Sequence, residues 1–83
     1  MYYYVYLIRS INNPHITYAG YTTNIKTRLE THNSGGSIYT KMHRPWEIVI
    51  CMAFKSMKCA KQFEQYLKSQ SGRAFAAKRF WIS

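Results

Sequence analysis

The first hydrophobic segment of the chain, Tyr2–Arg9, is dominated by aromatic and β-branched residues. A turn-forming cluster, Asn12-Asn13-Pro14, follows it closely, so we expect a strand that forms the first half of a hairpin. The residues from His15 to Tyr21 have the composition of the partner strand. The pattern therefore predicts a β-hairpin over residues 2–21.

The two faces of the first strand carry different residues, because successive side chains of a strand point to opposite sides of a sheet. Tyr4, Tyr6 and Ile8 share one face, and Val5 and Leu7 share the other. Both faces are aromatic or apolar, so we expect both to be at least partly covered. The pattern implies helices on one of them.

A helix is predicted over Ile25–Asn33. Thr22-Thr23-Asn24 supplies a capping residue before it, and Ser34-Gly35-Gly36 ends it. Arg28 and His32 lie on the same side of this helix as its apolar residues. We therefore expect both side chains at the edge of the core and not in bulk water.

The second half of the chain alternates between loop, strand and helix. Ser37–Arg44 has no clear period, which indicates a short helical turn or an ordered loop that ends at a proline. Trp46–Phe54 has the composition of a third strand. Ser56 is a suitable N-cap for a helix that continues to about Gln70, because the following apolar residues repeat at helical spacing.

A short basic helix is predicted over Arg73–Arg79, after which Phe80-Trp81-Ile82 is expected to pack back onto the core. No internal repeat and no long linker divides the chain, and 83 residues can enclose one modest core. We therefore expect a single domain that spans residues 1–83.

The charge balance points to the kind of partner. Twelve Lys and Arg stand against three acidic residues, and the net charge is +9. This exceeds what solubility requires and attracts polyanions, so nucleic acid is the expected partner. The candidates for contacts with the nucleic-acid backbone are Lys26, Lys41, Arg44, Lys61, Lys68, Arg73, Lys78 and Arg79.

Acidic residues are so few that they restrict the possible chemistry. Glu30 and Glu47 have simple structural explanations on an outer helix face and within a strand, which leaves Glu64. A solvated pair with Lys61 or Lys68 would also explain Glu64. One carboxylate is enough for magnesium or manganese, which keep several waters. The sequence lacks the spacing of a zinc hydrolase, a two-metal nuclease or a P-loop.

Several short motifs together resemble one family of nucleases. Tyr4-Val5-Tyr6 and Tyr18-Ala19-Gly20 resemble the two halves of the motif that names the GIY-YIG superfamily, and further matching segments follow in order. These segments are Thr23 to Leu29, His32-Asn33-Ser34-Gly35, Tyr39-Thr40, Arg44-Pro45-Trp46-Glu47 and Phe63-Glu64 with Leu67-Lys68. They are similar to the small stand-alone bacterial members of the UPF0213 type, which are related to the N-terminal nuclease domain of the bacterial excision-repair endonuclease.

This resemblance implies both a fold and an activity. The fold is α/β of the α+β kind, a small three-stranded antiparallel sheet flanked by helices in the order β-β-α-(α)-β-α-α. The activity is that of a metal-dependent DNA endonuclease, a phosphodiester hydrolase that is structure-selective or weakly sequence-specific. A role in DNA repair or recombination is implied at the level of the family, and RNA stays open as a second substrate.

The family's site residues fall on five positions of this chain. Glu64 is expected to hold a single Mg²⁺ or Mn²⁺ ion, and Arg28 to donate hydrogen bonds to the phosphate. Tyr6 is favoured as the base that activates water, with its pKa shifted by nearby cations and metal, and Tyr18 is the alternative. His32 is expected to orient the water or relay its proton.

Two other functions remain open at this point. The chain could be a non-catalytic nucleic-acid binder with the same fold, which would bind equally well without a divalent metal. It could also be a module that works only beside a protein partner that supplies specificity. Its oligomeric state is left open. Because the sequence shows neither a signal peptide nor a run long enough to span a bilayer, we expect a cytoplasmic location without membrane contact.

Overall fold

An antiparallel sheet of three strands, in the spatial order β2-β1-β3, forms the centre of the fold. The computed structural model describes residues 1–81, and in it the strands are β1 (Tyr3–Ser10), β2 (Thr17–Thr22) and β3 (Trp46–Phe54). The predicted hairpin and third strand are thus confirmed. Both β2 and β3 are edge strands. β1 lies between them, hydrogen-bonded to a strand on each side, and carries the most buried residues of the sheet.

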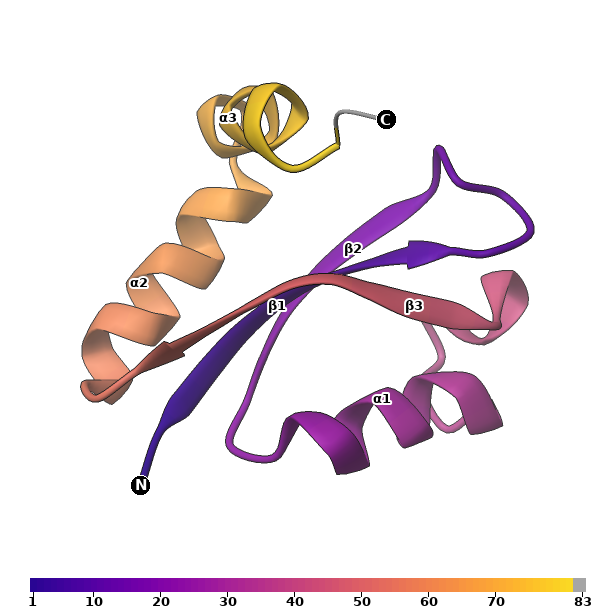
Figure 1. The fold of residues 1–83 in the computed structure, drawn as a ribbon, viewed down its shortest axis with the longest axis horizontal. Helices are drawn as coiled ribbons and strands as arrows, with labels where there is room; N and C mark the ends of the chain where they lie inside the picture. The colour runs from indigo at the N-terminus through magenta and orange to yellow at the C-terminus, as the bar shows by residue number, and fades with distance from the viewer. Residues whose placement is uncertain (82–83) are drawn as a thin grey trace.

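Helices cover both faces of this sheet (Figure 1). α1 (Ile25–Ser34) lies on one side, and α2 (Met57–Lys68) and α3 (Gln70–Arg79) lie on the other. The pattern had implied helices on one face, and the structure has helices on both. The expectation that both faces are covered is confirmed.

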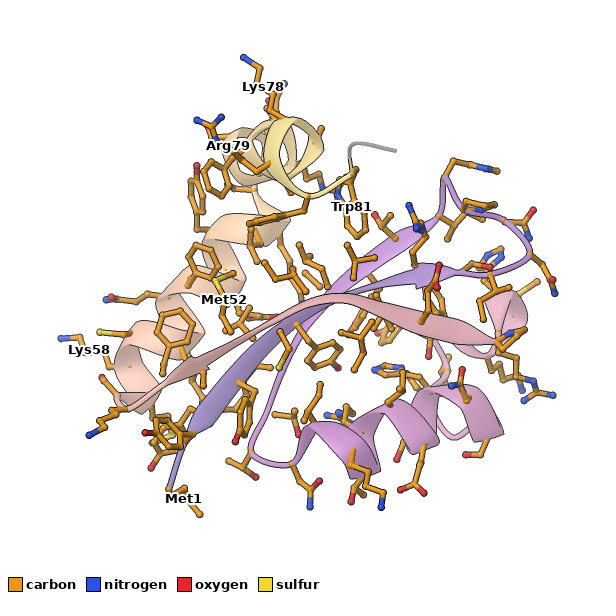
Figure 2. The ribbon with its side chains drawn as sticks, in the orientation of Figure 1. Met1, Met52, Lys58, Lys78, Arg79 and Trp81 are labelled. Atoms are coloured by element: carbon orange, nitrogen blue, oxygen red, sulfur yellow. The ribbon has the colours of Figure 1, made fainter. Side chains whose placement is uncertain are left out.

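Each face of β1 forms its own apolar cluster, and side chains from the helices complete both clusters (Figure 2). Val5 and Leu7 pack with residues of α2 and α3, including Leu67, whereas Tyr6 and Ile8 pack with Trp46 and with apolar residues of α1. The division follows the alternation of the strand. Tyr6 consequently lies on the face that α1 covers.

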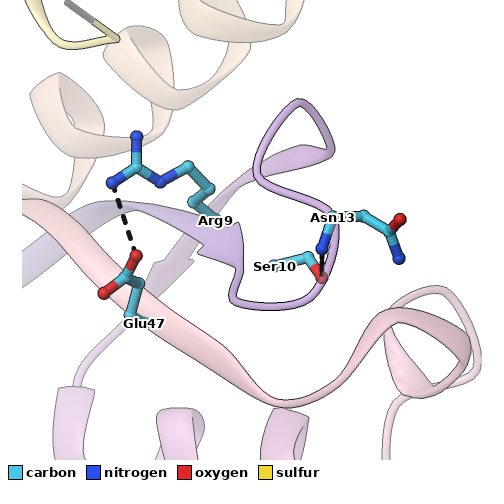
Figure 3. A network of polar contacts seen from close by, with 4 residues as sticks. All are labelled: Arg9, Ser10, Asn13 and Glu47. Atoms are coloured by element: carbon cyan, nitrogen blue, oxygen red, sulfur yellow. Dashed lines mark hydrogen bonds and ion pairs between the residues drawn. The ribbon is translucent and has the colours of Figure 1, made fainter. Parts of the chain in front are cut away.

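The connection between β1 and β2 is longer than predicted. β2 begins at Thr17 and not at His15, because Ile16 closes a loop by accepting from the Ser10 amide and donating to the Asn13 carbonyl, at 3.0 and 2.8 Å. The Ser10 hydroxyl accepts from the Asn13 amide inside this loop (Figure 3). These bonds satisfy polar groups of the loop backbone and of the Ser10 side chain.

Glu47 has the structural role expected for it. Its carboxylate pairs with Arg9 at 3.4 Å between the neighbouring strands β1 and β3 (Figure 3). Both side chains are partly exposed to solvent, so the pair contributes little to stability.

The limits of α1 agree with its predicted caps. The Asn24 side chain accepts from the Thr27 amide, and Gly35 ends the helix with a φ of 85°, a conformation that favours glycine. After it, Lys41–His43 forms a single 3-10 turn, which agrees with the expected short helical turn in this segment.

The boundary between α2 and α3 differs from the prediction. Ser56 caps α2 as expected, but α2 ends at Lys68 and α3 already begins at Gln70. The Ser69 side chain accepts from the Gly72 amide, and a Cβ on Gly72 would collide with the Tyr66 carbonyl. A sharp corner capped by Ser69 therefore replaces the longer helix that the apolar spacing had indicated.

The segment after α3 packs as predicted in the part that is described. Phe80 and Trp81 contact the apolar cluster between the sheet and α2–α3, whereas Ile82 lies outside the described residues. Within residues 1–81, no helix has the length and apolar character needed to cross a membrane.

Leu67→Ala tests whether α2 is held by its packing on the sheet. Leu67 is buried in the cluster that contains Val5, and truncation of such a residue costs about 2–5 kcal/mol. We expect a loss of this size in the free energy of unfolding, measured with urea. Gln62→Ala, at an exposed position of the same helix, is the control and should change stability by less than about 0.5 kcal/mol. Equal losses would contradict the packing model.

Candidate active site

A cavity of about 360 Å³ opens at the β2 edge of the sheet, where the two helical layers meet. Its walls come from β1, β2, α1 and α2. The lining residues are Tyr6, Tyr18, Gly20, Tyr21, Arg28, Lys61, Glu64 and Gln65. Four of the five residues that the sequence had singled out, Tyr6, Tyr18, Arg28 and Glu64, thus line one cavity.

Gly20 brings Tyr6 to this edge. Tyr6 pairs with Gly20 across the β1–β2 ladder, and a Cβ at residue 20 would collide with the ring and hydroxyl of Tyr6. Because glycine has no side chain, the Tyr6 ring crosses the backbone of the edge strand. Its hydroxyl therefore reaches a cavity that includes residues from the opposite helical layer.

His32, the fifth residue, lies behind Tyr6 and does not line the cavity. Its Nε2 is 2.8 Å from the Tyr6 hydroxyl, and its Nδ1 is 2.7 Å from the Thr40 hydroxyl. A neutral imidazole donates at one nitrogen and accepts at the other, so either Tyr6 donates to Nε2 while Nδ1 donates to Thr40, or both bonds run in reverse. This geometry fits a proton relay through Tyr6 better than direct contact with water.

Burial shifts the pKa values of Tyr6 and His32 in opposite directions. Burial raises the pKa of Tyr6 to about 12, and the nearby charge of Arg28 offsets only part of this shift. Burial and then the Arg28 charge lower the pKa of His32 below its ordinary 6.5. The expectation that cations would shift the pKa of Tyr6 toward neutrality is wrong for the protein alone, because removal of water from the phenolate outweighs the attraction to Arg28.

Glu64 is the one carboxylate among the residues that line this cavity. It is 8% exposed, and its Oε2 pairs with Lys68 at 2.5 Å along α2. The pair with Lys68 is the structural explanation that the sequence had left open, and it coexists with the position of Glu64 in the cavity wall. The other oxygen accepts weakly from Gln65 at 3.4 Å.

The donor set of the cavity fits a magnesium or manganese ion. Within residues 1–81, no group of three His, Cys, Asp or Glu side chains could bind a metal together, so a closed zinc-type site is not formed. Glu64 instead offers hard carboxylate oxygens to a solvent-accessible space. Such an ion can complete its shell with waters and substrate oxygens.

Arg28 is more exposed than its position beside the apolar stripe had suggested. It is exposed to solvent, and its side chain lines the open cavity that Tyr6 also lines. The expected location at the core edge is therefore wrong for Arg28, although it is right for His32. Lys61 contributes a second cation, with its Nζ 5.4 Å from the centre of the Tyr21 ring.

The cations predicted to contact nucleic acid are spread over the molecule. Lys61 lines the cavity and Lys68 pairs with Glu64. Lys78 and Arg79 project from the end of α3, away from the sheet (Figure 2). The remaining four, Lys26, Lys41, Arg44 and Arg73, are exposed.

Two residues have positions that the sequence had not assigned to them. Gly20 makes room for Tyr6, and Thr40, which is fully buried, holds His32. Both occur in segments that carried the family resemblance, Tyr18-Ala19-Gly20 and Tyr39-Thr40. The motif could thus have pointed to them, but only the fold shows what they contact.

The chain matches the family model described as the GIY-YIG catalytic domain over residues 2–78. It is similar to the UPF0213 protein YazA of Bacillus subtilis, with 44% identity over 52 residues, or 61% of this chain and 52% of YazA. It is also similar to a protein named structure-specific endonuclease subunit SLX1 from Malassezia globosa, with 41% identity over 75% of this chain and 15% of SLX1. The chain thus spans about half the length of YazA.

A solved structure confirms the fold independently. The solution NMR structure of the UPF0213 protein BH0048 from Bacillus halodurans superposes with a TM-score of 0.56 and 31% identity. The match covers 94% of this chain and 84% of that protein. The α+β arrangement and the family predicted from the sequence are therefore both supported by comparison.

The buried His32 should make the stability of the protein fall in mild acid. Its pKa is lowered in the folded chain, so the unfolded chain binds the proton more readily. Its contribution to stability is present above about pH 6.5 and is lost as the pH falls through the lowered pKa. NMR titration of the His32 ring measures the shift directly. A His32 midpoint at or above about 6.5 would contradict burial as the cause.

Proposed function

Because this chain belongs to the GIY-YIG catalytic-domain family, we propose that it is a metal-dependent DNA endonuclease and that the cavity at the β2 edge is its active site. The observation that carries the proposal is the meeting of Tyr6, Arg28 and Glu64 in one cavity, with Tyr6 bonded to His32. The SLX1 relative, which is named an endonuclease subunit, supports it.

In this proposal Glu64 holds a single Mg²⁺ or Mn²⁺ ion through its carboxylate. When bound, such an ion neutralises charge on the scissile phosphate and on the leaving oxygen. Lys68 occupies one Glu64 oxygen in the free protein, but its side chain is 42% exposed and can return its ammonium group to solvent. Metal binding would then replace one positive partner of Glu64 by another.

Arg28 binds the phosphate in this site. Its guanidinium donates charge-assisted hydrogen bonds to phosphate oxygens, and these bonds strengthen as negative charge develops in the transition state. Lys61 adds positive charge on the α2 side of the same cavity. The phosphate would thus lie between cations from the two helical layers, close to Tyr6.

The raised pKa of Tyr6 determines how water can be activated. With a pKa of about 12, ionisation of the phenol at neutral pH in advance of the reaction would cost about 7 kcal/mol. A relay avoids this cost: the Tyr6 hydroxyl takes a proton from the attacking water while its own proton moves to His32 Nε2. The water oxygen bonds to phosphorus, the bond to the leaving oxygen breaks, and solvent protonates the leaving group.

This relay uses one of the two hydrogen-bond directions open to His32. Nδ1 donates to Thr40, which leaves Nε2 free to accept from Tyr6. Since the pKa of His32 is lowered by burial, the ring is neutral and ready to accept near neutral pH. Tyr18, whose ring meets His32 edge-on at 5.5 Å between centroids, confines it and is proposed as a positioning residue.

The substrate is proposed to be branched or otherwise irregular DNA, with a function in repair or recombination. The charge of the chain favours any nucleic acid, and no fold known to read base sequence is present in residues 1–81. The SLX1 relative is named a structure-specific endonuclease subunit, which also favours a protein partner that contributes to specificity.

A non-catalytic nucleic-acid binder is the second candidate. One observation favours it: the pair between Lys68 and Glu64 gives the carboxylate a purely structural role. Such a protein would bind DNA in a salt-dependent manner without a requirement for divalent metal.

Glu64→Gln should abolish metal-dependent cleavage and largely preserve DNA binding, because it removes the charge that holds the ion and keeps the shape of the side chain. The assay is nicking of supercoiled plasmid and branched oligonucleotides with Mg²⁺, Mn²⁺ or chelator. Arg28→Ala should reduce the rate about 100- to 1000-fold. Glu30→Gln, an exposed glutamate of α1, is the matched control and should cut normally. Undiminished cutting by both site variants would refute the assignment, and no cutting by the wild type would favour the binder.

The relay predicts how the cleavage rate depends on pH. The rate should rise with pH through the lowered pKa of His32, below 6.5, and then stay level, because neutral His32 is the final proton acceptor. Tyr6→Phe should lose most of the activity, whereas Tyr66→Phe, at an exposed position of α2, should keep it. A rate that continues to rise tenfold per pH unit between about pH 8 and 10 would instead indicate a free tyrosinate base.

A further inference from the structure

A second and larger cavity lies next to the proposed active site. Its volume is about 820 Å³, and Tyr18 lines both cavities. Lys68 also lines the second cavity, while its Nζ contacts Glu64 in the first. Tyr18 thus borders both spaces, and the Lys68 ammonium lies 5.5 Å from the centre of its ring. A group bound in the second cavity would be a close neighbour of a phosphate bound in the first.

The wall of the second cavity combines aromatic rings with cations. Tyr18, Tyr39 and Trp81 contribute the rings, and Lys68 and Arg73 contribute the positive charges. No carboxylate is among its lining residues. Stacking surfaces beside cations are the means by which proteins bind single-stranded nucleic acid, because every base has a π-face and every linkage has a negative charge. The volume also lies in the range of cavities that hold molecules of nucleotide size.

The loop that carries Tyr39 leaves its side chain open to solvent. Tyr39 is 84% exposed, and its neighbours Ile38 and Met42 are each 82% exposed. Between them, Thr40 is fully buried and bonded to His32. The loop is therefore fixed at one inward residue while its apolar side chains point to solvent. Exposed side chains of this size, next to a cavity that one of them lines, indicate a surface that contacts a partner.

We propose that the second cavity binds an unpaired nucleotide of the substrate, with its base against Tyr39 and Trp81 and its phosphate near Arg73. The inference rests on the proposed function, because it places this nucleotide beside the scissile phosphate. A base inside a duplex is paired and stacked, so it cannot enter such a space without a cost that an unpaired base avoids. The cavity thus selects DNA with unpaired nucleotides at the cleavage site, such as flaps and junctions.

Tryptophan fluorescence tests this binding without any need for catalysis. The chain has two tryptophans, of which Trp46 is buried on the α1 side of the sheet and Trp81 lines the cavity. Short oligothymidylate, added in the presence of chelator, should quench the emission in a saturable manner. The quenching should disappear in Trp81→Phe. A matched strand of abasic units offers the same phosphates without bases, and it should bind about 5- to 150-fold more weakly.

Two variants at exposed positions localise the site. Arg73→Ala and Tyr39→Ala should each weaken binding of oligothymidylate, and neither change removes a buried side chain. Lys58→Ala removes the same charge at the far end of α2 (Figure 2), and Tyr2→Ala removes an exposed ring outside the cavity. Both controls should bind like the wild type. Equal affinity for the abasic strand, absence of quenching, or equal losses in site and control variants would overturn the proposal.

Failure of the nucleotide site and failure of the proposed nuclease function give different results. If the wild type cuts no DNA but binds oligothymidylate through Tyr39 and Arg73, the nucleotide site stands and the nuclease assignment falls. If the protein cuts DNA, Glu64→Gln stops it, and Tyr39→Ala still cuts flap and fully paired duplex in the wild-type ratio, the nuclease stands and the nucleotide site falls.

Discussion

The hydrogen bond between Tyr6 and His32 connects the parts of the molecule on which the proposed chemistry depends. It joins the central strand to α1, and the next bond, from His32 to Thr40, joins α1 to the following loop. The Trp46 indole then donates to the Thr40 carbonyl at 2.8 Å, which ties that loop to β3. One chain of buried polar contacts thus runs through four segments, so the position of the Tyr6 hydroxyl is fixed by the whole α1 side of the fold.

The cavity at the β2 edge places one carboxylate, Glu64, among cations. Twelve positive side chains draw in a polyanion from a distance, but a nuclease also has to neutralise the phosphate without repelling it from its own carboxylate. Glu64 meets both needs in the proposal, because Lys68 pairs with it and Lys61 and Arg28 line the same cavity.

The sequence predicted most of the elements because each left a local signal. Alternation in Tyr2–Arg9, the cap at Asn24 and the cap at Ser56 all depend on nearest neighbours along the chain. The corner at Ser69 was not predicted, because the spacing of apolar residues in the sequence continues through it. The site residues came from the family resemblance, whereas the raised pKa of Tyr6, the exposure of Arg28 and the place of Thr40 could not be predicted. These depend on which segments the fold brings together and on how much water the packing removes.

The loop around Thr40 assigns anchoring and surface contact to different residues. Its inward residue, Thr40, holds His32, while Ile38, Tyr39 and Met42 face outward and contribute little to the core. Substitutions at the outward positions should therefore be nearly free of cost to the fold. Under the proposed function, a lineage could use them to acquire a different preference for the shape of the DNA without a change in the residues of the active site. The loop thus combines an outer face that is open to substitution with one inward residue, Thr40, whose hydroxyl and carbonyl tie it to His32 and Trp46.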